Sequence, residues 1–403
     1  MPETYIAGLK ITPDVDAGLV RISVELDGPD PGNTQVKVQE AGTMIAQAET
    51  ASDGREIEIP LPAPKLWSPD SPYLYGLVIE TATDRVKSYF GMRKFSLGRD
   101  AHGCMRLCLN NQPVFQYGPL DQGYWPDGLY TPPSEDAMRS DLEMIKDLGC
   151  NMLRKHVKVE PARYYYDCDR LGLIVWQDMP NGGRAVGLLL SYLANLIEVK
   201  RRDDRWLWGA GRSHPDSRQD FRRELQEMVD YLHNFACIGM WVPFNEGWGQ
   251  FEASAIADWL QAYDPTRPVD HASGWFDQSG GDFRSLHVYF KDLPLLEPEG
   301  HRALIISEFG GYSLKVEGHM WNPQVEFGYR KFPDATSLTE AYVVLLEIQL
   351  KPWIEKGLSA AVYTQTTDVE IEVNGFVTYD RQMPKMVFNQ VKQAHQMLLS
   401  ALW

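Results

Sequence analysis

The chain has 403 residues, of which 44% are hydrophobic and 23% charged, so it is long enough for one barrel-sized domain and a smaller one. Asp and Glu outnumber Lys and Arg by 55 to 39, which gives a formal net charge of −16 at pH 7. No basic run could neutralise several phosphates, so we expect no nucleic-acid partner.

The 5 cysteines form no CxxC pair, which favours reduced structural thiols in a reducing compartment. The N-terminus, MPETYIAGLK, lacks the basic and then apolar pattern of a secretory leader. The longest apolar stretch, residues 186–197, is too short to cross a bilayer. We therefore expect a cytoplasmic protein with no membrane partner, and a truncated N-terminus remains an open alternative.

Residues 1–97 have the pattern of an all-β domain. Short runs of alternating hydrophobic and polar residues, at 20–26, 34–38, 56–59 and 75–80, are separated by turn clusters rich in Gly, Pro and Asp. Several short strands at this spacing predict an immunoglobulin-like β-sandwich.

Residues 98–403 change to alternating strands and helices. Ser134 is a candidate N-cap for a helix that carries Met138, Leu142 and Ile145 at helical spacing, and residues 221–232 repeat the pattern. The strand candidates are residues 112–118, 150–154, 173–178, 238–244, 269–272, 285–289, 303–307 and 359–364. This order predicts a catalytic (β/α)8 TIM barrel, so the fold class is multidomain β plus α/β.

Two glutamates stand at the ends of the fourth and seventh barrel strands, where TIM barrels carry their chemistry. Glu246 follows Asn245, and Glu308 follows an apolar run. Strands four and seven lie across the barrel from each other, so both carboxyls can reach one bond. Two carboxyls about 5–5.5 Å apart cleave a glycosidic bond with retention of configuration. The pattern predicts Glu246 as acid/base, Glu308 as nucleophile, and Asn245 as a donor to a sugar hydroxyl.

Four segments resemble one known family over nearly the whole chain. They are LWSPDSPYLY at 66–75, FGMRK at 90–94, NNQPVF at 110–115 and LGLIVW at 171–176. With the two glutamate motifs, they resemble the family 2 glycoside hydrolases, which include β-galactosidases, β-glucuronidases and β-mannosidases. Members normally begin with a jelly-roll sugar-binding domain. This chain starts at the immunoglobulin-like domain, so we expect the jelly roll to be lacking.

The resemblance implies the same roles for Glu246 and Glu308. It also implies that Arg154 and His156 are the basic pair near the nucleophile and the sugar, and that Tyr289 hydrogen-bonds the nucleophile. Other residues near strand ends complete the predicted substrate-binding set: His287, Trp248, Asp121, Gln365 and Asp368.

The default function is a retaining exo-β-glycosidase of the β-galactosidase kind, chosen on family frequency. An enzyme on a mannoside, a glucuronide or a furanoside is an open alternative, and so is a catalytically silent carbohydrate-binding or assembly protein. No histidine pair has tight ligand spacing, so we expect no metal and no cofactor. The expected partner is a carbohydrate. A homo-oligomer and the role of the insertion at 182–211 stay open.

Overall fold

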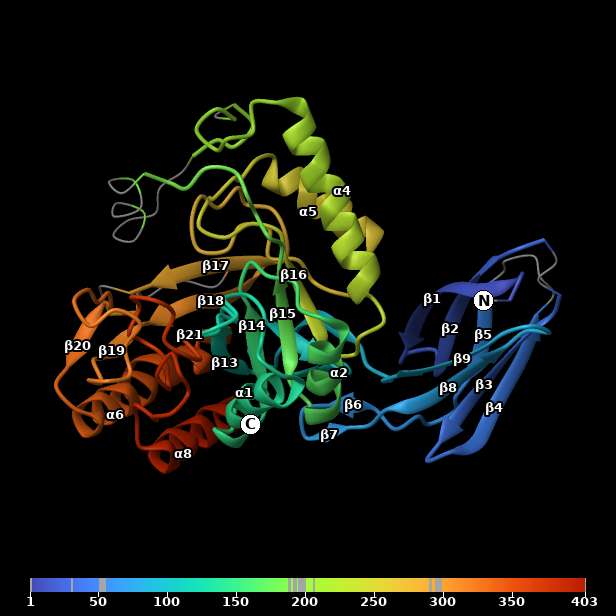
Figure 1. Cartoon of the computed structure of the whole chain (residues 1–403), viewed down its shortest axis with the longest axis horizontal. Coiled ribbons are helices and arrows are strands. Elements are labelled where there is room, and N and C mark those ends of the chain that lie inside the picture. Colours follow the sequence, from blue (N-terminus) through green and yellow to red (C-terminus); the bar gives the residue numbers. More distant parts are fainter. Residues whose placement is uncertain are drawn as a thin grey trace.

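The computed structural model describes residues 2–29, 32–50, 56–187, 190, 194, 201–205, 207–289, 292–293 and 299–402. It shows a β-sandwich followed by a TIM barrel, which confirms the predicted fold class (Figure 1). Within the described ranges we find no helix with the length and apolar character that a bilayer crossing requires.

The sandwich packs two antiparallel sheets against each other. One has the order β1(Tyr5–Asp14), β2(Leu19–Asp27), β5(Ile57–Pro60), and the other β4(Thr43–Thr50), β3(Thr34–Glu40), β8(Tyr75–Glu80), β9(Arg85–Phe90). Alternate residues face inward because side chains alternate along a strand. Val20 and Ile22 from one sheet and Val36 and Val38 from the other are fully buried in a core of their own.

The barrel sheet is parallel. Its strand order is β16(Ile238–Val242), β15(Ile174–Asp178), β14(Met152–Lys155), β13(Gln116–Asp121), β21(Leu358–Thr364), β18(Ala303–Gly310), β17(Phe283–Val288). The predicted fifth strand closes the ring between β16 and β17, but only through isolated bridges at Val269 and Ser273. On its other side, the backbone N–H of Asp282 donates to the Val269 carbonyl. The segment bends at residues 271–272, which interrupts the ladder.

The first barrel strand differs from its prediction. It starts at Gln116 and not at residue 112, because β12(Gln112–Pro113) pairs with β11(Met105–Leu109) in a small antiparallel sheet that also contains β10(Phe95–Arg99). Pro113 carries no N–H for a central ladder, so it fits this edge position. The remaining short strands are β6(Trp67–Ser68), β7(Ser71–Pro72), β19(Tyr312–Leu314) and β20(Arg330–Phe332).

Helices cover the outside of the barrel (Figure 1). The Ser134 hydroxyl accepts from the Ala137 N–H at 3.1 Å and caps the first helix, which buries Met138, Leu142 and Ile145 as predicted. The helices are α1(Glu135–Asp147), α2(Ala162–Leu171), α4(Pro215–Leu232), α5(Ala253–Tyr263), α6(Ala335–Val344), α7(Lys351–Glu355) and α8(Phe388–Leu399), with a π-helical turn η1(Leu345–Leu350) and a 3-10 turn η2(Ser400–Leu402).

Trp67 joins the two domains. It comes from the sandwich end of the chain but is fully buried in the barrel's core cluster. Its indole N–H donates to the Asp169 carbonyl at 2.8 Å, and its ring packs edge-on against Phe95. Trp67 is therefore one of the contacts that hold the barrel against the sandwich, together with hydrogen bonds such as those between the Asn234 side chain and the backbone of Leu9 and Ile11.

We expect Trp67→Ala to lower the free energy of unfolding by about 3–5 kcal/mol, because it leaves a cavity and an unpaired carbonyl at the junction. Urea denaturation followed by tryptophan fluorescence measures this. Trp259→Ala, which removes a half-exposed tryptophan from α5, is the matched control and should cost less than about 1 kcal/mol. Equal losses in the two variants would contradict the role given to Trp67.

Candidate active site

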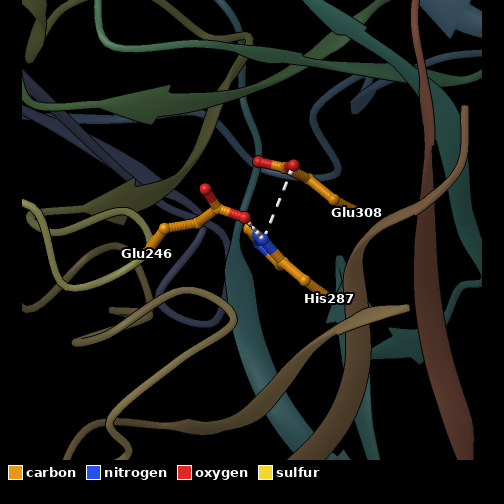
Figure 2. A group of neighbouring side chains, drawn as sticks. All are labelled: Glu246, His287 and Glu308. Atoms are coloured by element: carbon orange, nitrogen blue, oxygen red, sulfur yellow. Dashed lines mark hydrogen bonds and ion pairs between the residues drawn. The ribbon is translucent and has the colours of Figure 1, made fainter. Parts of the chain in front are cut away.

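The ends of β16 and β18 bring Glu246 and Glu308 together (Figure 2). Glu246 stands in a left-handed turn, with φ of 50° and Gly247 following at 70°, and its backbone N–H donates to the Ser273 carbonyl at 3.0 Å. Glu308 lies within β18 and is 4% exposed. One carboxylate oxygen of Glu246 lies within 4.8 Å of one carboxylate oxygen of Glu308. Two carboxyls this close can reach the same bond.

His287 lies between the two carboxylates (Figure 2). Its Nδ1 is 2.9 Å from Glu246 Oε1 and 3.5 Å from Glu308 Oε2, while its Nε2 is 3.2 Å from the Ser273 hydroxyl. Burial lowers the pKa of His287 to about 4, although the charge of Glu308 opposes this. The ring is therefore neutral at pH 7 and adds no positive charge beside Glu246.

Arg154 connects several residues of the site through hydrogen bonds. The side chain is fully buried and reaches residues on four segments. Its Nε and Nη2 donate to the two oxygens of Asp178 at 3.0 and 2.9 Å. Nη2 also donates to Asn245 Oδ1 at 2.8 Å, and Nη1 donates to Glu308 Oε1 at 3.1 Å. Burial on its own would lower the pKa of Arg154, but Asp178 and Glu308 raise it above its ordinary value.

Asp178 is a site residue that the sequence analysis missed. Besides Arg154, it holds His156, whose Nδ1 is 3.1 Å from Asp178 Oδ2. Burial acts to raise the pKa of Asp178, yet the charge of Arg154 holds it below its ordinary value. Asp178 is the last residue of β15, the same strand-end position that identified the glutamates, so this signal was available.

Tyr289 contacts the other oxygen of Glu308. Its hydroxyl donates to Glu308 Oε2 and lies 3.0 Å from the Thr364 hydroxyl. Burial, and then the charge of Glu308, raise the pKa of Tyr289 well above its ordinary value, so the phenol stays a donor. Its ring stacks on Tyr329 at 3.9 Å between centroids, a partner the sequence analysis did not identify.

The environment of Glu246 favours a protonated acid. Burial raises its pKa to about 7, against the opposing charges of His156 and Arg154. Its side chain keeps 17% exposure, so it can meet a ligand. Glu308 instead accepts from a guanidinium and a phenol. The two carboxyls thus differ in their contacts, as an acid and a nucleophile must.

A third acid, Glu372, lies close by. Its Oε2 accepts from Gln365 Nε2 at 2.8 Å and from Gln122 Nε2 at 3.4 Å. Burial raises the pKa of Glu372 to about 6, and the charges of Glu308 and Glu246 act in the same direction. Gln365 is therefore at the edge of the site, as predicted, but its amide already binds protein groups.

Two predicted sugar ligands have partners within the protein. Asp121 accepts from Lys155 at 3.1 Å, from Tyr164 at 2.6 Å and from the Gly123 N–H at 3.1 Å. Asp368 accepts from Lys385 at 2.6 Å and from the Gly375 N–H at 2.8 Å. Because buried charges require partners, the two lysines compensate these carboxylates. The contact of Asp121 and Asp368 with a sugar stays a prediction.

Trp248 is 43% exposed on the loop after β16. The two ends of the insertion predicted at 182–211 rest on this loop: the Gly249 N–H donates to the Arg184 carbonyl at 3.4 Å, and Arg212 Nε donates to the Gly249 carbonyl at 3.0 Å. Much of the insertion lies outside the described residues. The contacts of its described ends with the Trp248 loop favour the interpretation of the insertion as one wall of the site.

The expectation that no metal is needed stays a prediction. Glu246, His287 and Glu308 offer ligand atoms within 4.8 Å of one another, a spacing that could hold an ion. The hydrogen bonds described above account for the same three side chains without one.

Comparison with known proteins finds two family models along the chain. "Glycosyl hydrolases family 2" matches residues 4–93, and "Glycosyl hydrolases family 2, TIM barrel domain" matches residues 132–399. A β-galactosidase from Psychromonas ingrahamii is 27% identical over 391 residues, covering 88% of this chain and 34% of that protein. One from Pseudoalteromonas haloplanktis is 24% identical, covering 70% and 27%. The chain spans about a third or less of the length of these relatives.

Solved structures show the same fold at low identity. A β-galacturonidase from Eisenbergiella tayi bound to galacturonate has a TM-score of 0.69 at 19% identity, with 98% of this chain and 72% of that chain covered. A β-glucuronidase from Ruminococcus gnavus in complex with uronic isofagomine has a TM-score of 0.75 at 17% identity, with 98% and 69% covered. At this identity the likeness extends to the fold alone.

We expect Asp178→Asn to lower the free energy of unfolding by about 3–5 kcal/mol, because it leaves the buried Arg154 with half its counter-charge. Urea denaturation measures the loss. Asp136→Asn, which removes an 88% exposed partner of Arg139, is the control and should cost less than about 0.5 kcal/mol. A loss at Asp178 no larger than at Asp136 would contradict the central place of Arg154.

Proposed function

This chain belongs to glycosyl hydrolase family 2, and on that basis we propose that it is a retaining exo-β-glycosidase that removes terminal non-reducing sugars by double displacement. The observation that carries the proposal is the pair Glu246 and Glu308, with carboxylate oxygens within 4.8 Å of each other and contrasting partners. The chain covers only part of its relatives, so its activity is a proposal.

In the first step, an oxygen of Glu308 attacks the anomeric carbon while Glu246 gives its proton to the leaving oxygen. The glycosidic C–O bond breaks, a bond between the sugar and Glu308 forms, and the aglycone leaves as an alcohol. Arg154 and Tyr289 hold one oxygen each of Glu308 and orient it for attack.

In the second step, Glu246 is a carboxylate and takes a proton from a water molecule, whose oxygen attacks the same carbon. The bond to Glu308 breaks, the sugar leaves with its original configuration, and both side chains return to their starting states. His287, neutral and 2.9 Å from Glu246, stabilises either protonation state of Glu246 through one hydrogen bond.

Asn245 is proposed to hold a sugar hydroxyl beside the anomeric carbon. A guanidinium can only donate, so the contact with Arg154 requires Asn245 to turn its oxygen toward Arg154. The amide NH₂ is then the part of Asn245 that is left for a ligand. A bond from this group to a hydroxyl strengthens as charge develops on the sugar ring.

The proposed substrate is a neutral β-glycoside, with a β-galactoside as the first choice. The curated relatives support this, since those described above are named β-galactosidases. A uronic acid is disfavoured because its carboxylate would enter a site that holds Glu246, Glu308 and Glu372, and like charges in one pocket repel. Mannosides and furanosides stay as alternatives.

A cytoplasmic location stays a prediction, and a homo-oligomeric state stays open. The first domain itself matches a family model over residues 4–93. A carbohydrate is the proposed partner.

A panel of 4-nitrophenyl β-glycosides tests the proposal. We expect the wild type to hydrolyse at least one neutral β-glycoside, the β-galactoside first, and Glu308→Gln to lose at least about 10³-fold in kcat/KM because it removes the nucleophile. Glu58→Gln, a surface change in the sandwich, is the control and should keep full activity. Retained sugar binding without turnover of any glycoside would favour the catalytically silent alternative.

The pH dependence tests the acid. Glu246 must be protonated in the free enzyme, and its raised pKa of about 7 means that this form disappears above neutrality. We expect kcat/KM for an alkyl glycoside to fall about tenfold per pH unit above pH 7. A 2,4-dinitrophenyl glycoside needs no proton on its leaving oxygen and should show a weaker fall. A flat alkyl-glycoside profile from pH 6 to 9 would remove Glu246 from the acid role.

A further inference from the structure

A cavity of about 550 Å³ lies between the sandwich and the barrel. Its walls are the end of β1 with the turn that follows, Arg21, the chain leading into β10, Gln261 and residues 265–268 before the fifth barrel strand, and Asp282 before the sixth. It therefore opens at the N-terminal ends of the barrel strands, the face opposite to Glu246 and Glu308. The proposed glycosidase function makes no use of it.

Cationic side chains line this cavity, and nearly all of them have an acidic partner. Arg21 donates to Asp14 at 2.8 Å, and Lys94 to Asp16 at 2.5 Å. Arg267 donates to Asp264 at 3.0 Å. Each of these charges is neutralised within the protein.

Arg93 is the exception in the described part of the chain. It is 3% exposed, and its Nε donates to the Ala236 carbonyl at 3.1 Å. No described carboxylate or carbonyl accepts from its two terminal nitrogens, and its guanidinium packs 5.4 Å from the centre of the Phe95 ring. Burial, and then the charge of Arg267, lower the pKa of Arg93 to about 9. It is still charged at pH 7.

The described acids of the cavity wall accept hydrogen bonds from other groups and not from Arg93. Asp14 accepts from Arg21 and the Ala17 N–H. Asp282 accepts from Gln261 at 2.8 Å and from the Val269 N–H at 2.7 Å. A buried charge without a partner is costly. Asp264 and Asp169 act on Arg93 through their charges, but neither accepts a hydrogen bond from its two terminal nitrogens. These nitrogens are therefore left for an acceptor that enters from the cavity.

We propose that this cavity binds a small oxyanion, of the phosphate, sulfate or carboxylate class, on the terminal nitrogens of Arg93. The planar guanidinium matches two oxygens of such an anion and forms two parallel hydrogen bonds with them. The inference stands apart from the glycosidase proposal, since it rests on the opposite end of the barrel.

Isothermal titration calorimetry with inorganic phosphate, at constant ionic strength set with chloride, tests the site. We expect one phosphate per chain, and at least a tenfold loss of affinity in Arg93→Gln. Arg21→Gln is the matched control: it lines the same cavity, but its charge is already neutralised, so phosphate affinity should change less than about threefold. Titrations with sulfate and acetate distinguish the sources of the oxyanion, and binding of any one of the three supports the proposal.

Arg93→Gln could disturb the domain junction, so a second variant is needed. Ser96 lines the cavity, and Ser96→Phe fills it while leaving Arg93 in place. With its near-UV circular dichroism unchanged, this variant should also lose phosphate binding. The proposal is overturned by absence of oxyanion binding in the wild type, by unchanged binding in Arg93→Gln or Ser96→Phe, or by an equal loss in Arg21→Gln, which would show diffuse attraction and no built site. Unchanged phosphate binding in Glu308→Gln excludes the carboxylate site as the origin of the signal.

Discussion

The site depends on one constraint: the charge of the fully buried Arg154 guanidinium needs partners inside the protein. Arg154 lies within the barrel, where an uncompensated charge would cost several kcal/mol. Asp178 supplies a two-point contact from β15, Glu308 a second carboxylate from β18, and Asn245 an amide oxygen from the loop after β16. Compensating one charge therefore fixes the positions of three side chains around the same guanidinium. The positions of these side chains follow from the need to compensate the charge of Arg154 inside the barrel.

The same network gives two glutamates different properties. Glu308 accepts from Arg154 and Tyr289, while Glu246 has the neutral His287 as its hydrogen-bond partner and keeps its proton to about pH 7. These different partners suit the two roles that we propose, Glu308 as nucleophile and Glu246 as acid. Glu246 reaches its place through a left-handed turn that Gly247 continues, so the backbone after β16 is shaped for this one side chain.

Much of this could be predicted from the sequence, because the carboxyl ends of barrel strands meet at one face. That rule identified Glu246 and Glu308, the family resemblance added Arg154, and the structure brings the three together. The same rule applies to Asp178, which is the last residue of β15, but the sequence analysis missed it. Ion pairs between segments were harder to predict. Asp121 pairs with Lys155 from the neighbouring strand, and Asp368 pairs with Lys385 from a later part of the chain. Glu372 approaches the glutamates through the fold of its loop. Such pairings depend on tertiary contacts that no local pattern encodes.

The most direct test of the account is the configuration of the first sugar released. Proton NMR during the first minutes of hydrolysis of a β-glycoside, before mutarotation, separates the two anomers. The proposed double displacement through a sugar bound to Glu308 retains the configuration of the substrate, so the β-anomer should appear first. First appearance of the α-anomer would mean a single inverting displacement and would contradict the central claim.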